Sequence, residues 1–121
     1  MDQGIGKDAA AHPHREGNLR YAWCMRLKPG MAQEYQLRHD RIWPEMKALL
    51  SEAGYRDYAI FCYQELVFGT FATDNLETLL ACVKSSPVAA RWRAAMAELV
   101  ENEPDPRTGY QPLLTPIFYH S

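Results

Sequence analysis

The hydrophobic period of the sequence changes at Pro29-Gly30, and this change constrains the fold more than any other feature. Before it, "RYAWCMRLK" alternates, and one face is formed by Tyr21, Trp23, Met25 and Leu27. Strict alternation predicts a half-buried strand that ends at the Pro-Gly turn. After it, apolar residues recur every three or four positions as far as Gly54. That period predicts an amphipathic helix with a glycine at its C-terminal end.

Pro44 lies inside this helical pattern. A proline in a helix removes one backbone hydrogen bond and clashes with the preceding turn. The sequence therefore predicts a bend or break between Asp40 and Trp43. Such a break would orient His39 and Trp43 independently of each other.

The remaining elements follow from turn and capping signals. The segments "DYAIFCY" and "LVFGTFA" are separated by Gln64-Glu65, which predicts a tight hairpin of two strands. Asp74 and Glu77 have capping-box spacing at the start of one helix, and Ser86-Pro87 can begin another. "LLTPIFYH" predicts a last strand, at an edge or a bulge because Pro116 cannot donate a hydrogen bond.

The order strand, helix, strand, strand, helix, strand predicts an α+β fold of the ferredoxin-like (split βαβ) type. In it, one antiparallel sheet carries its helices on one face. The other face, rich in aromatic residues, then needs a cover, so we expect a homodimer of the dimeric α+β barrel type. Residues 1–18 show no apolar period and predict a mobile tail, which leaves residues 19–121 as a single domain.

Composition narrows the possible partners. Thirteen basic and fifteen acidic residues give a formal net charge of −2, which favours neither a nucleic acid nor a membrane surface as partner. No apolar stretch is long enough to span a bilayer. Three cysteines without ligand spacing, each inside an apolar run, indicate reduced, buried thiols and a cytoplasmic protein. His12 and His14 lack further ligands nearby, so we expect no metal site and no cofactor.

"EYQLRHDRIWPEM" places Tyr35, His39 and Trp43 four residues apart, on one helical face. An imidazole with an ordinary pKa of about 6.5 can accept or donate a proton at neutral pH. Tyrosine hydroxyls can donate hydrogen bonds, and aromatic faces can stack on the C–H surface of a sugar ring. A lone histidine among aromatics can equally be a packed core residue, and the pattern leaves both roles open.

The runs "EYQLRHDRIWPEM", "YAIF", "RW" and "PIFYH" resemble the L-rhamnose mutarotase family from about Arg20 to the C-terminus. The resemblance implies a dimeric isomerase that interconverts the α and β anomers of a 6-deoxy sugar without a cofactor. It implies that Tyr35 and His39 are catalytic and that Tyr58 and Trp92 bind the monosaccharide. The second of the family's paired tryptophans is replaced here by Arg93, which we add to the binding residues together with Trp43.

Three alternatives remain open at this point. L-Fucose, another 6-deoxy-L-hexose, competes with L-rhamnose as the substrate. A cofactor-independent oxygenase is a second candidate, because small dimeric ferredoxin-like proteins also carry that activity. A sugar-binding module without turnover is the third. For a mutarotase, we expect His39 to transfer protons while Tyr35 or Tyr58 supplies the complementary hydrogen bond.

Overall fold

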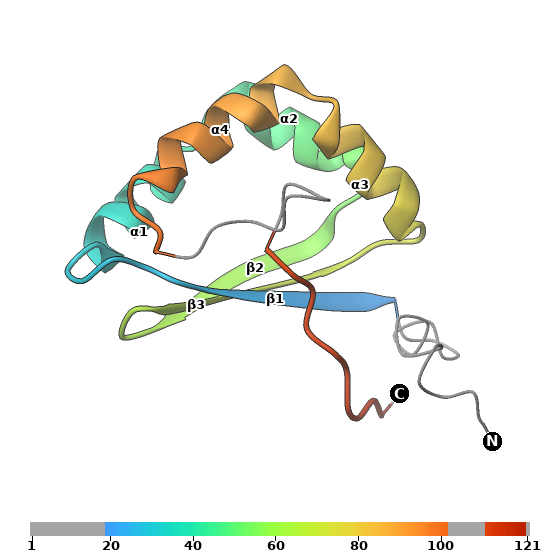
Figure 1. The fold of residues 1–121 in the computed structure, drawn as a ribbon. Helices are drawn as coiled ribbons and strands as arrows, with labels where there is room; N and C mark the ends of the chain where they lie inside the picture. The colour runs from blue at the N-terminus through green and yellow to red at the C-terminus, as the bar shows by residue number, and fades with distance from the viewer. Residues whose placement is uncertain (1–18, 102–110, 121) are drawn as a thin grey trace.

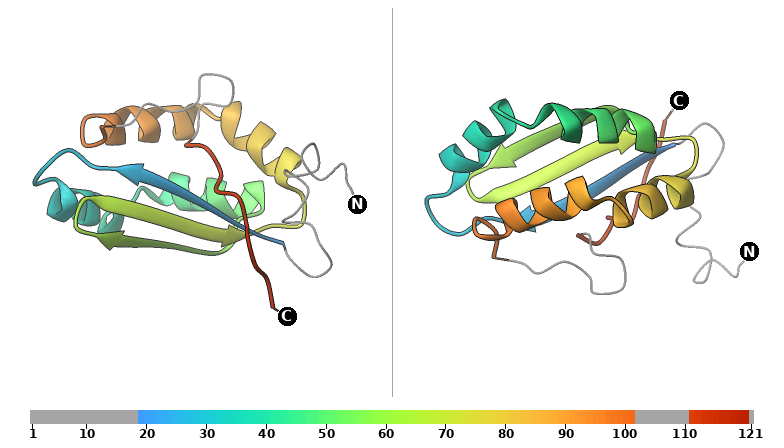
Figure 2. Two further views of the ribbon diagram at one scale, coloured as in Figure 1. Left: turned by 60° about the horizontal axis from the view of Figure 1, so that its bottom comes forward. Right: turned by 90° about the horizontal axis from the view of Figure 1, so that it is seen from above.

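The computed structural model describes residues 19–101 and 111–120, so the predicted tail at residues 1–18 lies outside the described residues. Within these residues, three antiparallel strands form one sheet in the order β1-β3-β2. The strands are β1 (Arg20–Arg26), β2 (Arg56–Tyr63) and β3 (Leu66–Ala72). The helices are α1 (Ala32–Asp40), α2 (Pro44–Ala53), α3 (Leu76–Lys84) and α4 (Pro87–Ala97). All four helices lie over the same face of the sheet (Figure 1, Figure 2), as the ferredoxin-like prediction requires.

The predicted helix break at Pro44 is confirmed. Helix α1 ends at Asp40, and Pro44 is the first residue of α2, where its missing N–H costs no helical hydrogen bond. Trp43 is extended, with φ −64° and ψ 140°, as expected for a residue that precedes proline. Gly54 ends α2 in the left-handed conformation at φ +102°. The helical backbone is therefore interrupted between Asp40 and Pro44.

The core between sheet and helices consists of two clusters of buried side chains. One is centred on Phe71 and Leu79 and the other on Leu27 and Val67. Two partly buried tryptophans, Trp23 of β1 and Trp92 of α4, pack against both clusters. These two side chains therefore connect the two clusters of the core.

The hairpin of β2 and β3 is confirmed, and it joins β1 in a regular ladder. Trp23, Gly69 and Ile60 stand in register across the three strands, and Trp23 and Ile60 pack into the core. The next row, Cys24, Phe68 and Phe61, therefore points to the face away from the helices.

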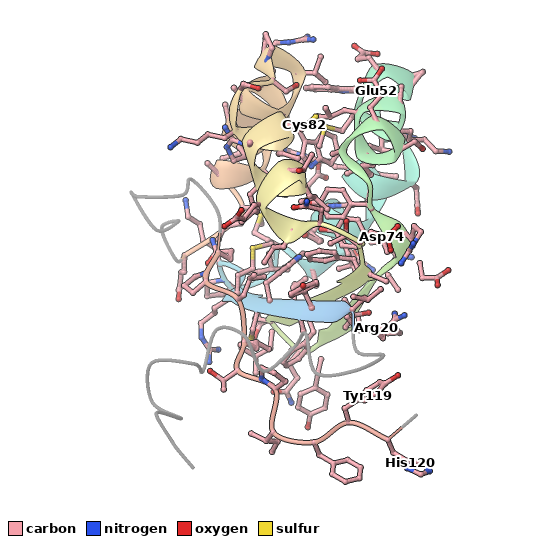
Figure 3. The ribbon with its side chains drawn as sticks, turned by 90° about the vertical axis from the view of Figure 1, so that its right-hand side faces the viewer. Arg20, Glu52, Asp74, Cys82, Tyr119 and His120 are labelled. Carbon is pink, nitrogen blue, oxygen red and sulfur yellow. The ribbon has the colours of Figure 1, made fainter. Side chains whose placement is uncertain are left out.

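The predicted last strand, "LLTPIFYH", is wrong. Leu113 forms one isolated bridge with Trp23, and the Leu114 N–H donates to the Ala22 carbonyl at 2.7 Å. This contact lies beside β1, where the fourth strand of the predicted fold belongs, but the pairing does not continue toward Pro116. Tyr119 and His120 end on the side of the sheet opposite the helices (Figure 3). A β-favouring composition is not sufficient for a strand, because a strand also needs a continuous hydrogen-bonding partner.

The predicted capping role of Asp74 is also wrong. Asn75 is the N-cap of α3, and its side-chain oxygen accepts from the Thr78 N–H at 3.0 Å. Asp74 instead pairs with Arg56 at 3.1 Å on the surface. The predicted cap of α4 is confirmed, because the Ser86 hydroxyl accepts from the Ala89 N–H. None of the helices in the described part of the chain has the length and apolar character needed to span a bilayer.

The two neighbouring polar residues before α3 should differ in their effect on stability. We expect Asn75→Ala to lower the free energy of unfolding by about 1 kcal/mol, because the Thr78 N–H loses its acceptor. Asp74→Ala removes an exposed ion pair and should have a smaller effect. Urea denaturation of both variants measures the difference. A larger loss for Asp74→Ala would show that Asp74 is the main cap.

Candidate active site

The predicted site residues come from three parts of the fold. Tyr35 and His39 lie one turn apart on α1, and Trp43 lies just before α2. Trp92 lies in the middle of α4, and Tyr58 lies on β2. Tyr58 packs against the core between sheet and helices, so it lies on the face of the sheet that the helices cover (Figure 1).

His39 lies between aromatic side chains of two helices. Its ring centroid is 4.3 Å from that of Tyr35 and 5.2 Å from that of Trp92, which it meets edge to face at 85°. Trp92 meets Trp43 in the same way, at 5.2 Å and 86°. The structure thus brings together four of the predicted residues, and the helix break allows His39 and Trp43 to contact the same indole.

The hydrogen bond of His39 fixes its protonation pattern. Its Nδ1 lies 2.9 Å from the Tyr35 carbonyl oxygen, which can only accept. Nδ1 therefore carries the proton, and Nε2 is the basic nitrogen of the neutral ring. Burial lowers the pKa of His39, while the hydrogen bond to Tyr35 and the charge of Asp40 oppose this shift in part. The neutral imidazole is consequently the main form at neutral pH.

Tyr35 and Tyr58 are also held in their neutral forms. Burial raises the pKa of both hydroxyls, and the charge of an ionised Tyr35 would raise the pKa of Tyr58 further. The two hydroxyls therefore act on each other electrostatically although they come from α1 and β2. At neutral pH both carry their proton and can donate a hydrogen bond.

Three residues that were not predicted as site residues hold Tyr58 in place. Its ring stacks on Tyr55 with centroids 4.8 Å apart and meets Phe71 at 5.7 Å. The Trp23 Nε1–H donates to the Tyr58 hydroxyl at 3.2 Å. The sequence does contain one sign of this contact, which is Gly69 inside an apolar strand. A glycine at such a position often marks a close approach by another group.

Arg38 fixes α1 against α4. Its guanidinium bonds Glu34 at 2.7 Å on its own helix, and it reaches the Ala95 carbonyl at 2.6 Å and Glu98 at 3.1 Å across the interface. These bonds hold the helix that carries His39 against the helix that carries Trp92. A pocket of about 310 Å³ lies between the two helices. Trp43, Trp92 and charged side chains such as Arg38 line it, whereas His39 and the two tyrosines are not among its lining residues.

Arg93 follows Trp92 on α4 and is partly buried, with its Nη1 atom shielded from solvent. In the described part of the chain, no group of three or more His, Cys, Asp or Glu side chains is arranged to hold a metal ion. Among the predicted site residues, the imidazole of His39 and the phenols of Tyr35 and Tyr58 are the groups that can exchange a proton with a bound ligand.

Comparison with known proteins identifies the family of this chain. A model of the L-rhamnose mutarotase family matches residues 20–120. An L-rhamnose mutarotase of Sinorhizobium fredii is 45% identical over 84% of this chain and 98% of its own length. One from Rhizobium meliloti is 42% identical over 79% of this chain and 93% of its own length.

Two solved structures are similar to the fold. The L-rhamnose mutarotase of Formosa agariphila is 28% identical and has a TM-score of 0.67, over 84% of this chain and 98% of its own. The tetracenomycin F2 cyclase of Streptomyces glaucescens, 15% identical with a TM-score of 0.63 over 84% of this chain and 96% of its own, shares the fold alone. The match over residues 20–120 and the identity to full-length relatives together show that this chain belongs to the L-rhamnose mutarotase family.

Proposed function

We propose that this protein is an isomerase that interconverts the α and β anomers of L-rhamnose by acid-base catalysis, without a cofactor. The observation that carries the proposal is the neutral His39 ring, packed between Tyr35 and Trp92 on the side of the sheet that holds Tyr58. Membership of the mutarotase family supports the same reaction. L-Rhamnose is preferred over L-fucose because the relatives with 42–45% identity are L-rhamnose mutarotases.

The reaction needs two proton transfers and no covalent intermediate. A base removes the proton from O1 of the hemiacetal while an acid protonates the ring oxygen, and the ring opens to the aldehyde. Rotation of the aldehyde and ring closure then give the other anomer. We assign the principal proton transfer to Nε2 of His39, which is unprotonated in the neutral ring.

The remaining site residues receive supporting roles. Tyr35 and Tyr58, both protonated at neutral pH, donate hydrogen bonds to sugar oxygens. Trp92 and Trp43 offer apolar surface to the C–H face of the ring. We include Arg93 as a sugar contact because of its place next to Trp92. Its guanidinium would supply hydrogen bonds that a second indole does not.

We further propose that the protein acts as a homodimer through the sheet face away from the helices. Phe61 and Tyr63 on β2 are 60% and 66% exposed, and Ile117 and Phe118 in the C-terminal segment are 96% and 84% exposed. Covering such side chains is the usual reason for a second copy. A cytoplasmic location is part of the proposal, in keeping with the free cysteines at positions 24, 62 and 82. The prediction that these thiols are buried is wrong, because Cys62 is exposed and the other two are half-buried.

The proposed activity is tested by saturation-transfer NMR on equilibrated L-rhamnose. We expect the protein to transfer saturation between the α and β anomeric signals faster than buffer alone, and to do so more weakly with L-fucose. Binding without transfer would indicate a sugar-binding module instead. Faster transfer with L-fucose would overturn the assignment of the sugar.

Replacement of His39 should separate catalysis from folding. We expect His39→Asn to slow enzyme-catalysed exchange by about 10²-fold, because the proton-transfer group is lost, while the folded state is retained. Gln36→Asn, an exposed change on the same helix, is the matched control and should keep full activity. Full exchange in folded His39→Asn would show that the tyrosines or water carry out the proton transfer instead.

The pH profile is a second readout of His39. Because burial lowers its pKa, exchange should stay level as the pH falls from 8 to about 6.5 and decline only below that. The free energy of unfolding should change with pH in the same direction as the exchange rate. The contribution of the neutral His39 ring to this free energy is complete above about pH 6.5. It is lost as the pH falls from there through the folded-state pKa. Both declines should be absent in His39→Asn.

The dimer is tested by sedimentation at micromolar concentration. We expect the wild type to sediment as a dimer and Phe61→Lys to shift it toward the monomer, since the new charge would be buried at the interface. Leu37→Lys, a similar change on α1 at a side chain 40% exposed, should leave the dimer intact. A monomeric wild type would refute the interface.

A further inference from the structure

Trp23 reaches Tyr58 across the whole width of the sheet. The strand order is β1-β3-β2, so the side chain of Trp23 must cross β3 to contact a residue on β2. Neighbouring strands lie about 4.8 Å apart, which only a long side chain lying along the sheet surface can span twice. The indole therefore lies over the central strand.

Gly69 provides the space for this indole. It stands in register with Trp23, and a Cβ atom at position 69 would overlap the Cε2, Cζ2 and Nε1 atoms of the indole. Nε1 is the atom that donates to Tyr58. Any side chain at position 69 would thus displace the donor itself.

The hydrogen bond determines the direction of the Tyr58 proton. An indole N–H can only donate, so the Tyr58 oxygen accepts from Trp23. The Tyr58 ring cannot turn freely because it is stacked on Tyr55 and contacts Phe71. With the ring fixed and one lone pair engaged, the hydroxyl proton must point away from Trp23.

We propose that Trp23 is a positioning residue that holds the Tyr58 hydroxyl as a hydrogen-bond donor to the bound sugar, and that Gly69 permits this by leaving room for the indole. The inference rests on the proposed function, since it assigns a role within the same site. It goes beyond that function by placing a residue on β1, two strands from Tyr58, in control of a substrate contact.

A double-mutant cycle in kcat/KM tests the coupling. Trp23→Phe keeps an aromatic ring over Gly69 but removes the N–H, so we expect kcat/KM for L-rhamnose to fall roughly 5-fold, the effect of one neutral hydrogen bond. In a Tyr58→Phe background the same change should have no further effect, because the hydroxyl that it acts through is absent. Equal losses in both backgrounds would overturn the proposal.

Two further variants separate positioning from general packing. Gly69→Ala retains both partners but displaces the indole, so it should reproduce the loss of Trp23→Phe and likewise have no further effect with Tyr58→Phe. Met25→Leu, a conservative change on the same face of β1, should keep kcat/KM unchanged. A comparable loss in Met25→Leu would make Trp23 a packing residue only.

The cycle also distinguishes a failure of the positioning role of Trp23 from a failure of the proposed mutarotase activity. An active wild type with independent losses overturns the positioning role alone and leaves the mutarotase activity standing. A wild type that does not accelerate anomer exchange overturns the proposed function, and the role of Trp23 with it.

Discussion

The arrangement of the candidate site depends on the packing of one side chain, Trp92, against two separate parts of the first helical region. Its indole meets His39 at the end of α1 and Trp43 before α2 with nearly the same edge-to-face geometry. One continuous helix would place these residues a turn apart on a straight line. The break imposed by Pro44 removes that restraint. The hydrogen bonds of Arg38 across to α4 then hold the contact in place.

The features of the fold that could be predicted are those with local causes. Pro44 and Gly54 act through their own backbones, and the two-residue connection of β2 and β3 is read directly from the sequence. The last strand failed for the opposite reason. Whether Leu113 and Leu114 extend into a strand depends on a hydrogen-bonding edge far away in the chain. Asp74 and Asn75 are adjacent and both good caps, so only the backbone geometry decides between them.

The same distinction applies to the site. The spacing of Tyr35 and His39 places them on one face of a helix, which is a local property. Tyr58 and Trp92 come from other elements, and only the resemblance to a family assigned them to the site. The pair of Trp23 and Gly69 was missed because it requires the strand order. Neither the alternation of β1 nor that of β3 shows that β3 separates β1 from β2.

The electrostatics of the site suit a neutral substrate. Burial disfavours the charged form of His39 and of both tyrosines, so the site presents one neutral base and two neutral donors. A buried imidazolium or phenolate would carry a desolvation cost, and a neutral sugar has no opposite charge to offset it. Ring opening of a hemiacetal moves protons between oxygen atoms of similar character, which an imidazole and hydrogen-bonded phenols can assist at neutral pH. Burial of these aromatic and titratable groups therefore contributes twice, because it stabilises the packing of α1 and α4 and also keeps the catalytic groups in the protonation states that the reaction requires.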